Sequence, residues 1–457
     1  MKALIFIEVD VVVRHFLHSG AFDDLGKHHL LTFVFPEIGN KRMGDLDPAT
    51  LHLPGKVKHL PVHEERRRLW KRLFQVSLFK PRFSAQAFAM RRLYGSALGW
   101  KASLQYALLG FPGIFHWFDR MTRRWIKRIP YTALEALIDQ EQPAVIIHPC
   151  VLEGLYLNDL IDSCQRRCIP LIVIMNSWDN PSTKRAMVGN PDWLLVWGEQ
   201  TQRHAVEFAQ MPLDRTIKFG AAQFDVYRAP PRIGRETFCQ VNGLNPALHI
   251  LLYAGSSKGT DEIAHLTALD LAIESGQLGP VTVLYRPHPW GGGGRNGHLL
   301  LDAVWQNVHI ESSMKDYLEK VCGGFTGKYL PDYRDTHDVL SCVDAVISPL
   351  STIILEAALH GKPVMCFLPL GDTSTHFRRD LALTHFHQMF DVPEILVAKG
   401  EQSLIVQTQL LLQKVGEREG AARLRKAMNF FVEPFDHPYP VRLRAFVEQV
   451  LASTSAS

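Results

Sequence analysis

The feature that most constrains this fold is the alternation of short apolar runs with helix-like stretches, clearest at residues 345–367. Apolar runs stand at both ends of this segment. The stretch between them begins with Ser351 and Thr352, which are typical helix N-cap residues, and ends at Gly361, a typical helix stop. This spacing predicts a strand, a tight turn, a helix and a second strand. The turn would aim backbone N–H groups and two hydroxyls at whatever lies above the sheet edge, which suits an anion.

The same alternation covers the chain on either side of one break. Strands separated by helices predict parallel sheets, because parallel strands need crossover connections. Prolines at 230, 231 and 246 interrupt the pattern and indicate a linker. We therefore predict an α/β protein with two doubly wound domains facing a cleft. The expected limits are 1–221 for the first domain, 222–247 for the linker, 248–440 for the second domain and 441–457 for a C-terminal helix and tail.

Residues 61–130 replace the alternation with a basic, aromatic and helical stretch. Between Glu64 and Arg128 there are fifteen Lys or Arg residues and three acids, a local charge of +12 in a chain of net charge +4. Interleaved aromatic and basic side chains are typical of a helix on an anionic membrane surface. The alternatives are a helical insertion with a solvated basic face, or nucleic-acid binding, for which no motif is present. We expect a membrane partner and no nucleic acid.

Composition excludes several other classes of protein. Apolar residues make up 46% of the chain and charged residues 21%, as in globular proteins. The seven cysteines are scattered, without Cys-x-x-Cys or Cys/His ligand spacing, so we interpret them as reduced and predict no metal. No window reaches the ~18–20 apolar residues of a membrane span, and the first residues do not form a signal peptide. We expect a cytoplasmic protein, peripheral on the inner face of the cell membrane.

Three loops of the second domain carry groups suited to a phosphate. The loop after the predicted strand 249–254 contributes three residues, Ser256, Ser257 and Lys258, without Walker A spacing. After the next predicted strand, prolines on both sides fix the direction of His288, which can bind a phosphate or act as a general acid. Arg286 offers a second cationic contact. The third loop is the one with Ser351 and Thr352.

These loops are expected to converge on one phosphate or diphosphate, because ligands of open parallel sheets lie at the carboxyl ends of the strands. Glu356, one helical turn beyond Thr352, can accept hydrogen bonds from sugar hydroxyls beside that phosphate. Each loop taken alone also has an ordinary structural explanation, as a capped helix or a rigid turn.

Three carboxylates of the first domain are candidates for a general base. Glu153 stands just after the predicted strand 144–148, near the start of a helix, where it would face the expected cleft. Asp10 and Asp179 follow other predicted strands and compete for the same role. Each of the three has an ordinary alternative as a helix cap or a loop residue.

Taken together, the motifs between residues 140 and 370 resemble those of glycosyltransferases with the GT-B architecture. Closest are bacterial surface-polysaccharide enzymes, namely CDP-glycerol glycerophosphotransferase-like proteins and the capsule sialyl- and Kdo-transferases. The matching features are the His-Pro pair at His288, the paired hydroxyls Ser351-Thr352, and Glu356 within Leu-Glu-Ala-Ala-Leu-His-Gly-Lys-Pro-Val. The stretches that begin at Ser177, Val196 and Phe219 also look like those of such transferases.

The resemblance implies roles for these residues. His288, Ser351 and Thr352 would hold the phosphate of the donor, and Glu356 would face its ribose. Glu153-Gly154 is similar to the acidic-Gly motif that carries the base in the sialyltransferases, although Leu152 stands where a doubly acidic version has another acid. No metal and no tightly bound cofactor are implied, since helix N-termini and histidine would stabilise the leaving nucleotide.

We therefore expect a metal-independent, inverting glycosyltransferase with Glu153 and His288 as its catalytic residues. Its donor would be a CMP-, CDP- or UDP-linked sugar held by residues 248–440, and its acceptor a surface polysaccharide or lipid-linked glycan met by residues 1–221. One alternative is a UDP-sugar 2-epimerase-like enzyme of the same fold, although residues 345–367 lack the Gly-Gly pattern expected there. The other is a non-catalytic component of a polysaccharide assembly complex.

Overall fold

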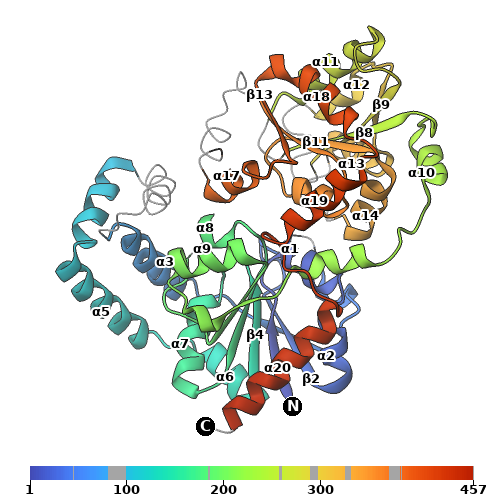
Figure 1. Ribbon diagram of the computed structural model, residues 1–457. Helices are drawn as coiled ribbons and strands as arrows, with labels where there is room; N and C mark the ends of the chain where they lie inside the picture. Colours follow the sequence, from blue (N-terminus) through green and yellow to red (C-terminus); the bar gives the residue numbers. More distant parts are fainter. Residues whose placement is uncertain are drawn as a thin grey trace. The chain divides into compact units, whose positions relative to one another are not determined.

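The chain forms two compact units in the computed structural model (Figure 1). The first unit comprises Met1–Gln223 with Phe430–Ser457, and the second comprises Phe224–Asn429. Each contains one sheet in which every pairing is parallel, so the predicted α/β class with two doubly wound domains is confirmed. The structure describes residues 1–44, 46–80, 99–183, 186–256, 260–288, 297–324, 331–369, 381 and 383–455.

The sheet of the first unit has seven strands in the order β3-β2-β1-β4-β5-β6-β7. Its central strands, such as β4 and β5, are short apolar runs buried on both faces, whereas the edge strand β3 is largely exposed. After β3 the chain returns to place β4 beside β1, so the strand order reverses between these two strands. The strands are β1 (Lys2–Phe6), β2 (Leu30–Pro36), β3 (Lys56–Leu60), β4 (Val145–Cys150), β5 (Leu171–Met175), β6 (Trp193–Val196) and β7 (Thr216–Lys218).

Helices cover this sheet, and the last helix of the chain is one of them. That helix, α20 (Tyr439–Ser455), packs against α2 (Asp23–His28), and Arg444 Nε donates to Asp24 Oδ2 at 2.8 Å. Tyr439, Leu443 and Val447 on α20 belong to the apolar core of the sheet. The other helices are α1 (Asp10–Val12), η1 (Val13–Leu17), η2 (Pro48–Thr50), α6 (Thr132–Glu141), α7 (Leu157–Arg167), α8 (Asn180–Thr183), α9 (Glu199–Ala209) and η3 (Leu213–Arg215).

The predicted basic helical insertion is present in the first unit. It contains α3 (Glu64–Leu78), helical residues 99–109 and α5 (Pro112–Arg128). The inner faces of α3 and α5 pack an apolar cluster that includes Trp70 and Phe118. A buried ion pair between Arg66 and Asp159, 2.8 Å apart, fastens the insertion to α7, and the indole of Trp70 donates to the same carboxylate. Arg66 is therefore structural, because its charge is compensated inside the protein.

The sheet of the second unit has six strands in the order β10-β9-β8-β11-β12-β13. The predicted strand–helix–strand at residues 345–367 is confirmed as β11, α15 and β12. The strands are β8 (His249–Ala254), β9 (Val281–Arg286), β10 (Val308–Ile310), β11 (Ala345–Ser348), β12 (Val364–Leu368) and β13 (Leu396–Lys399). The helices are α10 (Arg235–Asn242), α11 (Glu262–Glu274), α12 (Gly297–Asp302), α13 (Ser312–Cys322), α14 (Tyr333–Cys342), α15 (Ile353–Leu359), α17 (Thr384–Phe390), η6 (Glu401–Ser403), α18 (Leu404–Gln413) and α19 (Arg418–Met428).

Residues 222–247, which the sequence predicts to be a linker, contain the 3-10 helix η4 (Ala222–Arg228) and helix α10. Arg235 at the start of α10 donates to the carboxylate of Asp344, just before β11, at 2.8 and 3.1 Å. This part of the chain is thus tied to the sheet of the second unit.

Candidate functional site

In the second unit, the polar loops predicted from the sequence lie at one edge of the sheet. Strands β9, β8 and β11 are neighbours, and their carboxyl ends lead to His288, Ser256 and the Ser351-Thr352 pair. The strand order reverses between β8 and β11, the position where open parallel sheets bind ligands. The sequence predicts that these residues converge on one phosphate, and the strands that precede them are neighbours in this sheet.

The loop after β8 is shaped by a buried acid that the sequence analysis missed. The carboxylate of Glu262 on α11 accepts the backbone N–H of Ser256 at 2.7 Å, and burial raises its pKa to about 7. A Cβ at Gly255 would lie only 2.7 Å from the same carboxylate. Ser256 thus donates its N–H group within the protein. Ser257 and Lys258 lie outside the described residues.

The turn after β9 presents His288, which is half-buried. Arg286, expected as a second phosphate contact, is buried, and its Nη1 donates to Thr336 Oγ1 on α14 at 3.1 Å. In this arrangement the guanidinium links the end of β9 to α14.

The loop after β11 leads into α15 with Ser351 and Thr352 half-buried. Thr352 occupies the N-cap position, but its side chain makes no capping hydrogen bond. Glu356, expected to face a ribose, is largely buried, and its Oε2 accepts the phenolic O–H of Tyr227 at 2.6 Å. Sequence reasoning missed Tyr227 because it lies in the segment interpreted as a linker.

In the first unit, Glu153 lies on a loop at the carboxyl end of β4, beside β1, where the strand order of this sheet reverses. The loop backbone is held from several sides. Leu152 is buried with φ +58°, a conformation that costs a non-glycine residue energy. Arg42 Nη1 donates to the carbonyl of Glu153 at 3.0 Å, and the backbone carbonyl of Arg42 accepts from Asp10 N–H at 3.1 Å. Glu153 is therefore presented by a rigid loop.

Glu8 is the main support of this loop, and it was not singled out from the sequence. Its Oε2 accepts the N–H groups of Leu155 and Tyr156 at 2.5 and 3.2 Å, at the start of α7. A Cβ at Gly154 would lie 2.2 Å from Glu8 Oε1, so the position requires glycine. The sequence did contain a signal, because Glu8 follows the apolar strand β1. A carboxylate at such a position is buried and therefore needs hydrogen-bonding partners.

Glu153 lines a pocket of about 30 Å³ together with the cationic side chains of Arg42, Arg67 and Lys71. The remaining lining includes Asn158 on α7 and residues of the Glu153 loop. Asp159, which is ion-paired with Arg66, lines the same pocket, so its cationic side chains outnumber its carboxylates and favour a group that carries negative charge.

The two competing carboxylates have local structural partners. Asp10 is buried, and its Oδ1 accepts the N–H of Val11 at 2.7 Å. Asp179 accepts the hydroxyl of Thr183 at 3.0 Å, within the turn that contains α8. These contacts match the alternative roles of helix cap and loop residue, and Glu153 is the candidate that lines the pocket described above.

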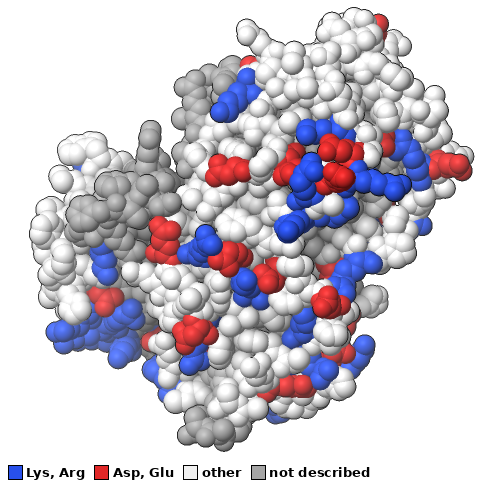
Figure 2. Space-filling view, viewed as in Figure 1, with Lys and Arg blue, Asp and Glu red and all other residues white. Residues whose placement is uncertain are grey.

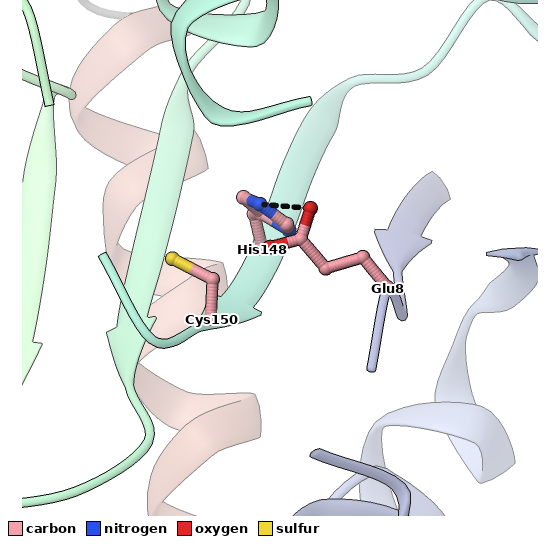
Figure 3. Close-up of side chains that lie close together, drawn as sticks. All are labelled: Glu8, His148 and Cys150. Carbon is pink, nitrogen blue, oxygen red and sulfur yellow. Dashed lines mark ion pairs between the residues drawn. The ribbon is translucent and has the colours of Figure 1, made fainter. Parts of the chain in front are cut away.

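Three buried side chains of the first unit offer donor atoms to a common point, Glu8, His148 and Cys150 (Figure 3). One donor atom from each lies within 4.8 Å of the others. Burial and the Glu8 charge raise the pKa of the Cys150 thiol well above its usual value. Among the described residues, this group can hold a metal; we predicted none from the sequence, in which Glu8 lies 140 positions before His148.

Comparison with known proteins identifies the fold. No family model and no curated protein matches the sequence. A structure described as a UDP-N-acetylglucosamine 2-epimerase of Listeria monocytogenes aligns over 98% of this chain and 96% of its own, with TM-score 0.56 and 10% identity. The Neisseria meningitidis UDP-N-acetylglucosamine 2-epimerase, solved with UDP-N-acetylglucosamine, aligns over 99% of both chains with TM-score 0.52 and 14% identity.

The wall teichoic acid polymerase TagF aligns over 100% of this chain and 90% of its own, with TM-score 0.50 and 11% identity. At such identities the likeness concerns the fold, which is the GT-B-like pair of Rossmann-like domains predicted from the sequence. The neighbours are enzymes, and they include both classes that the sequence analysis weighed, transferases and epimerases.

Proposed function

We propose that this protein is an enzyme that transfers a sugar from a nucleotide-linked donor, with the donor bound by the second unit. The observation that carries the proposal is the placement of His288, Ser256 and the Ser351-Thr352 pair at the reversal point of one parallel sheet. In the proposed complex, His288 and the two hydroxyls meet the donor phosphate, and Glu356, oriented by Tyr227, accepts from the ribose.

The proposed reaction uses Glu153 of the first unit as its general base. Glu153 takes the proton of an acceptor hydroxyl while that oxygen attacks the anomeric carbon, and the bond from that carbon to the phosphate breaks. The nucleotide leaves with the bonding electrons, and His288 stabilises its new charge. One displacement of this kind inverts the anomeric configuration and uses no metal. The donor is a CMP-, CDP- or UDP-linked sugar.

The basic insertion supports a proposed seat on an anionic membrane, near a lipid-linked or polymeric glycan acceptor. Exposed large apolar side chains recur at helical spacing along its helices, at Trp100, Leu104, Leu108, Phe111, Ile114, Trp117 and Trp125. Figure 2 shows Lys and Arg side chains gathered over α5. Among the described residues, no helix has both the length and the apolar character needed to span a bilayer.

Helix α5 divides into three faces, as an interfacial helix requires. At about 100° per residue, the side chains that pack inward (Phe115, Phe118, Thr122 and Ile126) fall within about 80° of one another. Ile114, Trp117 and Trp125 form the adjacent exposed stripe, of similar width. On its far side Arg120, Arg123, Arg124 and Lys127 line a hollow of about 290 Å³. Aromatic side chains next to a basic stripe suit an interface with anionic lipid headgroups.

The second candidate function is a 2-epimerase-like reaction on a UDP-sugar, which the two epimerase neighbours favour. It needs no acceptor glycan. The two proposals differ in what an isolated donor becomes: an epimerase converts it to an isomeric sugar, whereas a transferase moves the sugar to an added acceptor.

The test is incubation of the full chain with CMP-, CDP- and UDP-linked sugars, with and without glycan acceptors, followed by chromatography of products. We expect release of free nucleotide that depends on His288 and Glu153. His288→Ala is compared with His249→Ala, an exposed histidine at the amino end of β8, which should leave turnover unchanged. Neither release nor isomerisation of any donor, with no thermal shift by free nucleotides, would overturn the proposal.

A further inference from the structure

We propose that Glu8, His148 and Cys150 form a binding site for one divalent transition-metal ion of the zinc type in the core of the first unit. Glu8 follows β1, and His148 and Cys150 lie on β4, the adjacent strand (Figure 3). All three side chains are fully buried. Two atoms of these side chains, Glu8 Oε1 and His148 Nε2, make no hydrogen bond to any residue that the structure describes.

The direction of His148 indicates that a cation is needed beside Glu8. Its Nδ1 lies 3.2 Å from the carbonyl oxygen of Phe6, which can only accept, so Nδ1 carries the hydrogen. In a neutral imidazole, Nε2 then directs a lone pair toward Glu8 Oε2, 3.6 Å away, the oxygen that also accepts the N–H groups of Leu155 and Tyr156. Two electron-rich atoms facing each other in a buried site are unfavourable unless a positive charge lies between them.

The distance between His148 Nε2 and Glu8 Oε2 distinguishes the two cations that can supply this charge, a proton and a metal ion. A proton on Nε2 would draw the carboxylate to the about 2.7–3.2 Å of an N–H···O hydrogen bond. Two nitrogen or oxygen ligands of one tetrahedral zinc ion instead lie about 3.3 Å apart, and a sulfur ligand lies about 3.6 Å from either. The observed 3.6 Å matches ligands of a metal better than a hydrogen-bonded pair.

The charges also balance with a divalent ion. One carboxylate and one thiolate carry two negative charges and the imidazole is neutral, so an M²⁺ ion makes the cluster neutral within the core. A mixed set of sulfur, nitrogen and oxygen ligands favours Zn²⁺ over Mg²⁺ or Ca²⁺.

Groups around the three ligands are placed as in metal sites. The Phe6 carbonyl fixes the imidazole, and the N–H of Leu152 donates to Cys150 Sγ at 3.4 Å. Glu8 is held by the N–H groups at the start of α7. Because the ligands are enclosed, the ion would not touch substrate. The ion would instead hold β1, β4 and the Glu153 loop together. This structural role is independent of the proposed reaction.

The test measures metal in the purified full chain by mass spectrometry and then replaces it with Co²⁺ after chelation. We expect about one equivalent of zinc per chain, and a Co²⁺ form with a thiolate charge-transfer band in the near ultraviolet. Cys168 and Cys322, the exposed thiols, are first replaced by Ala to remove surface binding. In that background, Cys150→Ser should lose the band and the metal equivalent, and His148→Gln should lower metal affinity at least tenfold.

Cys164→Ala is the matched control, because it removes another buried cysteine of the same unit outside the cluster, and the band should persist. A folded protein that binds neither Zn²⁺ nor Co²⁺ after chelation would overturn the proposal, as would a thiolate band that survives Cys150→Ser. If Cys150→Ser does not fold, the spectrum of the Co²⁺ form with Cys150 intact decides: without a thiolate band the proposal fails.

Discussion

The phenolic oxygen of Tyr227 lies 2.6 Å from a carboxylate oxygen of Glu356, and the bond joins η4 to helix α15. The tyrosine ring also lies edge-on against His360, with centroids 4.4 Å apart. The carboxylate proposed to bind the donor ribose is therefore positioned by a residue about 130 positions earlier in the chain.

Replacing Tyr227 with Phe should weaken donor binding, because it removes a hydrogen bond to a buried carboxylate. Bonds of this kind contribute about 1.5–3 kcal/mol, which corresponds to roughly 10- to 100-fold in the donor dissociation constant. Calorimetric titration with the donor nucleotide measures the effect. Tyr106→Phe, which removes a 3.4 Å contact with Gln75 in the basic insertion, is the control. Equal affinities in both variants would contradict the role of Tyr227.

Glu153→Gln should abolish sugar transfer while leaving the fold intact. The side chain is half-buried at a pocket, and loss of a general base typically costs 10²–10⁴-fold in rate. Turnover and the thermal midpoint are measured together. Asp179→Asn removes a competing carboxylate of the same sheet edge and should keep most of the activity. The assignment of Glu153 fails if the two variants behave in the opposite way.

Gly154→Ala should reduce both stability and turnover. The added methyl group would lie 2.2 Å from Glu8 Oε1, so the Glu153 loop must shift or the carboxylate must leave its N–H partners. We expect a loss of about 1–3 kcal/mol in the free energy of unfolding. Gly113→Ala on α5 introduces the same group where no atom lies within 4 Å and should be close to neutral. Denaturant titrations of both variants provide the comparison.

Glu262 should make the second unit less stable as the pH rises from about 4.5 to 7. Burial raises its pKa from 4.5 to about 7, so the unfolded chain releases this proton at a lower pH than the native one. Between those values the native state binds more protons, and stability falls with pH by up to about 3 kcal/mol. Glu262→Gln removes the titrating group. Urea unfolding at pH 5 and 8 should show a smaller loss for Glu262→Gln, and equal losses would contradict the assignment.

Removal of Arg120 and Arg124 by substitution with Gln should weaken binding to anionic vesicles about 30-fold. Each basic residue near an anionic surface contributes about 1 kcal/mol. Trp125→Ala should weaken binding to the same vesicles through lost burial of its exposed ring. Sedimentation with phosphatidylcholine vesicles, with and without phosphatidylglycerol, measures the effect. Arg203→Gln removes an exposed charge from α9 and should change nothing; an equal loss there would indicate non-specific attraction.

Local pattern was sufficient for the strand–helix–strand at residues 345–367 and for the residues that follow strands, but not for helix α10, which lies in the predicted linker. The apolar run, turn residues and glycine of residues 345–367 act within a few positions of one another, and β11, α15 and β12 form there. Because parallel strands end at one edge, the positions of Ser256, His288 and Ser351 also followed from the order of the elements.

Partners distant in the chain could not be predicted in this way. Tyr227 reaches Glu356, Glu8 reaches Gly154 and its neighbours, and Arg42 reaches Glu153, each across more than a hundred residues. Such contacts depend on the strand order, which local periodicity does not specify. The role expected for Arg286 illustrates the same point, since its guanidinium turns to Thr336 on α14.

The sequence by itself determined two parallel α/β units, a basic helical insertion and a set of polar strand-end loops, because periodicity and turn chemistry are local properties. Only the tertiary structure decided which buried groups orient those loops. Glu8 became the support of the Glu153 loop and a neighbour of His148 because β1 and β4 lie side by side, although about 140 residues separate them in the chain.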